Sequence, residues 1–170
     1  MFVLFAGFWA VSADAAKIPC KIKLPYITEG CQEDGCKVVY QIVFDRETQL
    51  VKDIQSKVIV QKVALGTKVK KPFEFAIEVK RPGIYRTLDQ SFDLANEKYR
   101  LRKGVLFEVF YYAGAGHYAV CVEDKIEKVQ LKNDAEALDP AKTQEWIKVK
   151  LDAKTSGFVK RNEVRIISAE

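Results

Sequence analysis

WIKVKLDAKTSGFVKRNEV, residues 146–164, is the stretch that decides the fold of this chain. Its first half alternates, with Ile147 and Val149 on one side and Lys148 and Lys150 on the other. This period of two puts one face of a strand in a core and the other face in water. A polar turn and a glycine-aromatic-valine run follow, and the apolar residues near the end of the chain supply a last strand. We therefore expect a tight hairpin followed by a terminal strand.

The order of these features resembles the closing half of bacterial SH3-like (SH3b) domains. Residues 49–69 are similar to an earlier part of the same family, with a short apolar step, a polar loop ending in Ser-Lys-Val, and a strand that closes on Gly66 and Val69. Gly66 stands where the chain turns sharply into the next strand. The resemblance implies a small β-barrel that binds a ligand and does not catalyse a reaction.

Residues 70–145 separate these two segments, and a small barrel has no room for them. We predict a mainly β fold, with an SH3-like barrel in residues 37–170 that carries a hairpin-rich insertion at about residues 71–145. A larger barrel, or a second small sheet packed on the first, is the alternative.

Several further strands are expected from local pattern. Residues 37–44 are rich in β-branched and aromatic side chains, and residues 73–80 alternate cleanly. Residues 105–112 and 117–123 flank Ala-Gly-Ala-Gly, which predicts a hairpin with a four-residue connection. Residues 132–145 have the composition of a helix.

The N-terminus predicts export. Residues 2–11 are uncharged and are followed by Ala13 and Ala15, the small residues that a signal peptidase recognises, so residues 1–15 are expected to be a signal peptide. A buried N-terminal strand or helix is the alternative. The segment is too short for a membrane span, which needs about 20 apolar residues. We expect a periplasmic or secreted protein without a membrane span in its mature chain.

Four cysteines follow this segment, and an even number in an exported protein predicts disulfides. Cys31 and Cys36 flank a short loop and form the natural local pair, which leaves Cys20 to pair with Cys121. The alternative joins Cys20 to Cys31 and Cys36 to Cys121. A Cys-x4-Cys spacing with one histidine in the chain matches no usual zinc site, so no metal or other cofactor is expected. Residues 16–36 are thus predicted to be an irregular, disulfide-bearing arm.

The strand that contains Cys121 suggests how this arm is attached. Val120 and Val122 are expected to point into the core, so Cys121 should share the outer face of the sheet with Ala119 and His117. An arm that bears Cys20 can cross that face and pair with Cys121.

Composition and motifs favour binding over catalysis. The chain is 48% hydrophobic and 30% charged with a net charge of +5, and its basic residues are spread along it, which argues against a nucleic-acid partner. His117 and Cys121 lie about 13 Å apart on a straight strand, too far for a catalytic pair. No phosphate loop, nucleophile elbow or metal motif is present.

The aromatic side chains are the predicted ligand-binding residues: Tyr111, Tyr112 and Tyr118 at the hairpin tip, and Trp146, which points away from the apolar face of its strand. SH3-like barrels bind extended peptides in grooves lined by such residues. We expect a non-enzymatic module of the cell envelope that recognises peptide, peptidoglycan or a partner protein. The alternatives are an inhibitor of a wall hydrolase or protease and, third, a hydrolase that uses Cys121 and His117.

Overall fold

The computed structural model describes residues 17–18, 20–32, 39–70, 73–88, 92–94, 99–131 and 135–168. Over these residues the chain forms β-strands and one short 3-10 turn without any α-helix, so the predicted mainly β fold is confirmed. None of the described residues form a helix with the length and hydropathy of a membrane span. The predicted signal peptide (residues 1–15) and Cys36 lie outside the described residues.

The elements are β1 (Tyr26–Glu29), β2 (Val39–Phe44), β3 (Thr48–Val51), β4 (Ile59–Val63), β5 (Lys68–Lys70), β6 (Glu74–Arg81), β7 (Gly83–Thr87), β8 (Phe92–Leu94), β9 (Tyr99–Leu101), β10 (Leu106–Gly114), β11 (His117–Val122), β12 (Lys125–Gln130), β13 (Ala135–Asp139), β14 (Lys142–Lys150), β15 (Ser156–Lys160), the turn η2 (Arg161–Glu163) and β16 (Val164–Ser168).

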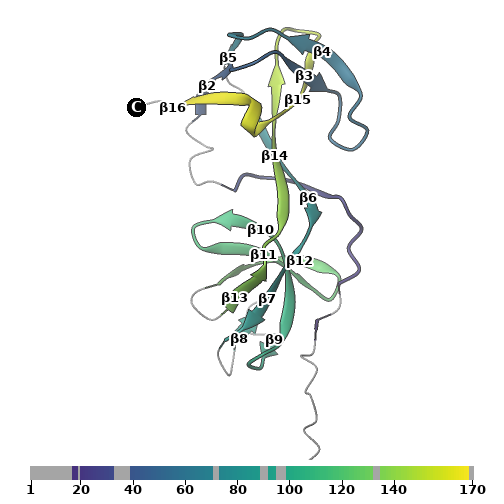
Figure 1. Cartoon of the computed structure of the whole chain (residues 1–170), viewed down its shortest axis with the longest axis vertical. Coiled ribbons are helices and arrows are strands. Elements are labelled where there is room, and N and C mark those ends of the chain that lie inside the picture. Colours follow the sequence, from purple (N-terminus) through teal and green to yellow (C-terminus); the bar gives the residue numbers. More distant parts are fainter. Residues whose placement is uncertain are drawn as a thin grey trace, which may run out of the picture.

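These strands form antiparallel sheets. A six-stranded sheet has the order β1-β6-β14-β15-β3-β4, a five-stranded sheet the order β12-β11-β10-β7-β13, and a three-stranded sheet the order β16-β2-β5, while β8 and β9 pair as a ribbon. Figure 1 shows β2 to β5, β15 and β16 at one end of the molecule and β7 to β13 at the other, with β6 and β14 running between them. Each sheet is open in the described part of the chain, where no closed barrel is found.

Two continuous stretches of chain connect the two ends of the molecule. β6 leads through Pro82 into β7, and β13 leads through Pro140 into β14. The two stretches run side by side, because β6 pairs with β14 and β7 pairs with β13. Proline cannot donate to a strand ladder, so both prolines lie where the ribbon passes from one sheet to the other. At this crossing a Cβ on Gly83 would lie 2.6 Å from the backbone nitrogen of Ala141, so the close approach of the two strands requires glycine.

Buried apolar side chains form clusters at both ends of the molecule and between the two ends. Ten residues that come only from 39–69 and 147–164 form one cluster: Val39, Ile42, Phe44, Leu50, Val63, Val69, Ile147, Val149, Val159 and Val164. A second cluster fills one face of the five-stranded sheet with Leu101, Phe107, Val109, Val120, Val122, Val129 and Leu131. A third joins β6 to the opposite face of that sheet with Ile77, Val79, Phe110, Tyr111, Ala119 and Cys121.

Most of the expected strands are present. β2, β6, the hairpin of β10 and β11, and the group formed by β14, β15 and β16 match the strands predicted from alternation. The hairpin connection is shorter than the predicted four residues, because Gly114 pairs with His117 and leaves only Ala115 and Gly116 between the strands. These two residues have φ of +49° and +74°, the backbone of a two-residue turn that matches the twist of a hairpin.

Two local predictions are wrong. Residues 135–139 and 142–145, which fall in the expected helix at residues 132–145, belong to strands β13 and β14. Pairing of Ala135 with Thr87 on β7 outweighs the helix-forming composition of this segment, and Pro140 would break a helix in any case. The arm at residues 16–36 is not wholly irregular either, because β1 adds to the edge of β6 with Tyr26 opposite Val79.

The disulfide between Cys20 and Cys121 is present, as predicted, with 6.0 Å between the Cα atoms. Cys121 and Ala119 share the face opposite Val120 and Val122, as predicted, and because the arm covers that face Cys121 is only 1% exposed and Ala119 is fully buried. Cys20, Ile22 and Tyr26 of the arm pack over this face and exclude water from it. Cys31 is also disulfide-bonded, and its predicted partner Cys36 lies outside the described residues, so that pairing stays a prediction.

Candidate functional site

The predicted ligand-binding aromatics do not form one group. Tyr112 and Tyr118 are cross-strand neighbours on β10 and β11, with ring centroids 5.1 Å apart in a T-shaped contact. Tyr85 on β7 continues this row, 6.1 Å from Tyr118. All three side chains are half-buried. Burial, and then the neighbouring Tyr118, raises the pKa of the Tyr85 hydroxyl.

The hairpin tip is held by Tyr112. Its hydroxyl accepts a 3.0 Å hydrogen bond from the backbone N–H of Gly116, which fixes the ring against the turn. Tyr111 points to the opposite face of the sheet, where it is 5% exposed among the third cluster, and burial raises the pKa of its hydroxyl. The hairpin therefore presents two of the three predicted tyrosines on one side and buries the third.

Trp146 belongs to a different part of the molecule. It lies on the face of β14 opposite Ile147 and Val149, as predicted, but it is only 3% exposed and packs with Val51 and Ile54. Its indole N–H donates to Oε2 of Glu78, a carboxylate that is itself 3% exposed. The Lys57 ammonium lies 3.5 Å from the other oxygen of this carboxylate.

A groove of about 390 Å³ opens above Trp146. Its sides come from the β3–β4 hairpin, from β15 and from η2, which are brought together by the single cross-strand pair of Phe158 with Val51. The lining combines three apolar side chains with charges of both signs and small polar groups: Val51, Ile59, Trp146, Glu47, Glu163, Lys57, Lys160, Thr48 and Gln49. Lys160 and Glu163 form an ion pair at 3.6 Å on one rim.

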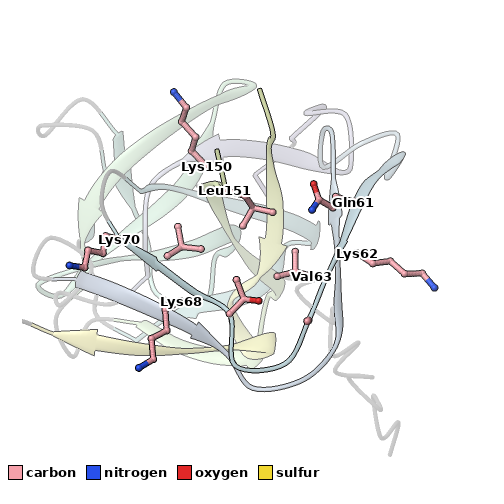
Figure 2. A pocket seen from close by; sticks show the side chains of 10 residues that line it. Gln61, Lys62, Val63, Lys68, Lys70, Lys150 and Leu151 are labelled. Carbon is pink, nitrogen blue, oxygen red and sulfur yellow. The ribbon is translucent and has the colours of Figure 1, made fainter. Parts of the chain in front are cut away.

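A second cavity, of about 490 Å³, lies at the open end of the first cluster (Figure 2). Val63 and Val69, both core residues, and the partly buried Leu151 form its floor. Four lysines come from three separate segments: Lys62 on β4, Lys68 and Lys70 on β5, and Lys150 at the end of β14. Figure 2 shows these lysine side chains extending outward from the rim while Leu151 and Val63 face the middle. No carboxylate is among the described residues that line this cavity.

Cys121 and His117, the two residues of the hydrolase alternative, each have another partner. Cys121 is a half-cystine and not a thiolate, and His117 is exposed on the turn with Nδ1 3.0 Å from the carbonyl oxygen of Ala115. The described residues contain no group of three or more His, Cys, Asp or Glu side chains placed to hold a metal ion.

Comparison with family models, with curated proteins and with solved structures found no match.

Sequence reasoning singled out Trp146 and missed the other walls of its groove. Ile59 and Lys57 lie nearly ninety positions away in the chain, and only the pairing of β15 with β3 brings them over the indole. The signal that was available is the apolar run at residues 58–60, which is too hydrophobic for the solvent side of a hairpin.

Proposed function

We propose that this protein is a non-enzymatic binding module that holds an extended peptide in the groove over Trp146. The observation that carries the proposal is the make-up of the groove: an apolar floor of Val51, Ile59 and Trp146 between acidic and basic side chains. Peptide-binding grooves combine apolar pockets for side chains with a few polar groups that fix orientation. The hydrogen bond from Trp146 to Glu78 fixes the indole before a ligand arrives.

The proposed architecture is an SH3-like barrel with an insertion. Its support is that residues 49–69 and 146–164, the two segments that resemble SH3b domains, share one core: Leu50, Val63 and Val69 pack with Ile147, Val149 and Val159. Residues 83–139 supply the five-stranded sheet. The chain leaves the six-stranded sheet at the end of β6 and returns to it at the start of β14, the strand that pairs with β6. This is the arrangement expected of an insertion near residues 71–145.

The cell envelope is the proposed location. Its support is the predicted signal peptide together with the disulfide that ties Cys20 to Cys121, since disulfides persist in oxidising compartments. In that compartment the extended peptides available to such a groove include the peptide stems of peptidoglycan. We therefore propose peptidoglycan as the ligand, recognised through its peptide portion.

A pull-down of the purified, oxidised protein on peptidoglycan tests this function. Wild-type protein should be retained. Ile59→Asp would bury a charge under the ligand and Lys160→Glu would reverse a charge on the rim, so each variant should weaken retention about tenfold. Leu138→Asp is the matched control, since Leu138 is 49% exposed on β13 and Ile59 is 53% exposed. Full retention of both groove variants would overturn the proposal. Inhibition of a wall hydrolase without retention on peptidoglycan would favour the inhibitor alternative.

A further inference from the structure

The edge strand β4 is the feature from which we infer a second interaction surface, beyond the proposed function. β4 is last in the order of the six-stranded sheet, and no described strand pairs with its outer side. Figure 1 shows it at the outer margin of its end of the molecule. An edge strand presents a row of unpaired N–H and C=O groups that another strand can use.

The side chains of this edge are unusually apolar. Four of the eight large hydrophobic side chains exposed in the described part of the chain fall within residues 58–65: Val58 (56%), Ile59 (53%), Val60 (47%) and Leu65 (68%). A soluble β protein usually covers or charges such an edge, and an exposed apolar stretch rimmed by polar groups marks an interaction site.

The charged side chains around the cavity beside the C-terminal half of β4 are, among the described residues, all lysines. Lys62 on β4 and Lys68 on β5 form no ion pair with any described residue, and both line the 490 Å³ cavity next to the C-terminal half of β4. Some lysines elsewhere do form ion pairs, as Lys17 does with Glu108 and Lys148 with Glu74. Several lysines gathered around one cavity with an apolar floor, to which no described residue contributes a carboxylate, point to an acidic partner.

We propose that β4 accepts an extended, acidic and apolar segment of a partner protein as an added strand. The backbone of the segment hydrogen-bonds to the free edge of β4. One of its apolar side chains enters the cavity over Val63, Val69 and Leu151, and its carboxylates meet Lys62 and Lys68. Strand addition of this kind takes affinity from the main chain and specificity from pockets for alternate side chains.

Two other occupants fit the observations less well. A second copy of this chain would bring another lysine-bearing β4 to the edge, and like charges on facing strands oppose pairing. A polyanion would match the lysines, but it would leave Val58, Val60 and Leu65 in water and the backbone edge unused.

Fluorescence anisotropy with labelled peptides tests the proposal on the oxidised, full chain. The probe is a short peptide of alternating valine and glutamate. The first control replaces glutamate by lysine, and the second is N-methylated at alternate residues so that one edge cannot donate hydrogen bonds. The glutamate peptide should bind, and each control should bind at least tenfold more weakly.

Charge exchange on the protein gives the matching test. The double variant Lys62→Glu/Lys68→Glu should lose about tenfold in affinity for the glutamate peptide and gain affinity for the lysine peptide, because each reversal replaces attraction by repulsion. Lys125→Glu, at an exposed position on β12 in the other sheet, should leave both affinities unchanged. Lys160→Glu, in the Trp146 groove, should also leave them unchanged, which separates this surface from the proposed peptidoglycan site.

Three results would overturn the inference. Equal binding of the glutamate and lysine peptides would remove the acidic specificity. Undiminished binding of the N-methylated peptide would indicate a simple polyanion site. A dimer in sedimentation that the glutamate peptide does not dissociate would show that a second copy covers the edge.

Discussion

The indole Nε1 of Trp146 donates a 3.0 Å hydrogen bond to Oε2 of Glu78, and both side chains are 3% exposed. β6 and β14 are direct neighbours, so the two residues approach from adjacent strands on the face away from the first cluster. A buried carboxylate is costly unless it is paired and hydrogen-bonded, and here Trp146 and the Lys57 ammonium supply its partners. The same contact fixes the floor of the groove.

Replacing Trp146 by phenylalanine should lower the free energy of unfolding by about 1–3 kcal/mol, because it keeps an aromatic ring but leaves one oxygen of a buried carboxylate unpaired. Denaturant unfolding measures the change. The double variant Trp146→Phe/Glu78→Leu is the control, since it removes both partners and should recover part of the loss. A double variant whose loss equals the sum of the two single losses would show that the contact has no coupling energy.

Gly157 should be irreplaceable for a steric reason. A Cβ at this position would lie 2.8 Å from the carbonyl oxygen of Val51, 3.1 Å from Cβ of Leu50 and 3.2 Å from Cγ2 of Val60. Gly157→Ala should therefore push the β3–β4 hairpin away from β15 and destabilise the protein by about 1–3 kcal/mol. Thermal unfolding measures the loss, with Ser156→Ala at the exposed neighbouring position as the control. Equal midpoints for the two variants would contradict this account.

The alternation of apolar and polar residues predicted which side chains of β14 enter the core, because Ile147 and Val149 lie on one face of the strand and Lys148 and Lys150 on the other. It could not predict whether the second face of a strand is covered. Ala119 and Cys121 were expected on the outer face of the sheet, and they are buried because an arm that lies about a hundred residues earlier packs on them. Trp146 is buried for the same kind of reason, under Ile54 and its neighbours. Coverage of this kind depends on long-range topology, which local periodicity does not encode.

The disulfide between Cys20 and Cys121 should contribute strongly to stability, because the two cysteines are 101 positions apart. In the chain-entropy model a cross-link that closes a loop of about 100 residues stabilises by roughly 4.7 kcal/mol. The variant Cys20→Ser/Cys121→Ala should therefore lose about 3–5 kcal/mol in denaturant unfolding.

Mass spectrometry of a non-reduced digest checks the pairing itself. It should recover the peptides of Cys20 and Cys121 joined together, and the predicted Cys31–Cys36 bridge as a separate species. Free thiols on Cys20 and Cys121 in freshly purified protein would contradict the first bridge, and a Cys36–Cys121 link would contradict both.

Asp152 should make the hairpin between β14 and β15 sensitive to acid. Its Oδ1 accepts the backbone N–H groups of Lys154 at 2.7 Å and Thr155 at 2.8 Å, and these hydrogen bonds hold the pKa of its carboxyl below the usual value of 3.8. The folded chain thus favours the ionised form more than the unfolded chain does. The resulting stabilisation is fully present above about pH 4, the value of the unfolded carboxyl, and is lost as the pH falls through the lower pKa of the folded state.

Asp152→Asn isolates this effect, because the amide keeps an oxygen acceptor but cannot ionise. Thermal midpoints of wild type and variant, measured from neutral pH down to the acid limit of folding, should differ in favour of wild type at neutral pH and converge as the carboxyl becomes protonated. Asp53, whose pKa is lowered by the Ser56 hydroxyl, is present in both proteins, so its contribution to the pH dependence cancels when the two thermal midpoints are subtracted. A difference that stays constant with pH would show that Asp152 stabilises the turn through shape and not through its charge.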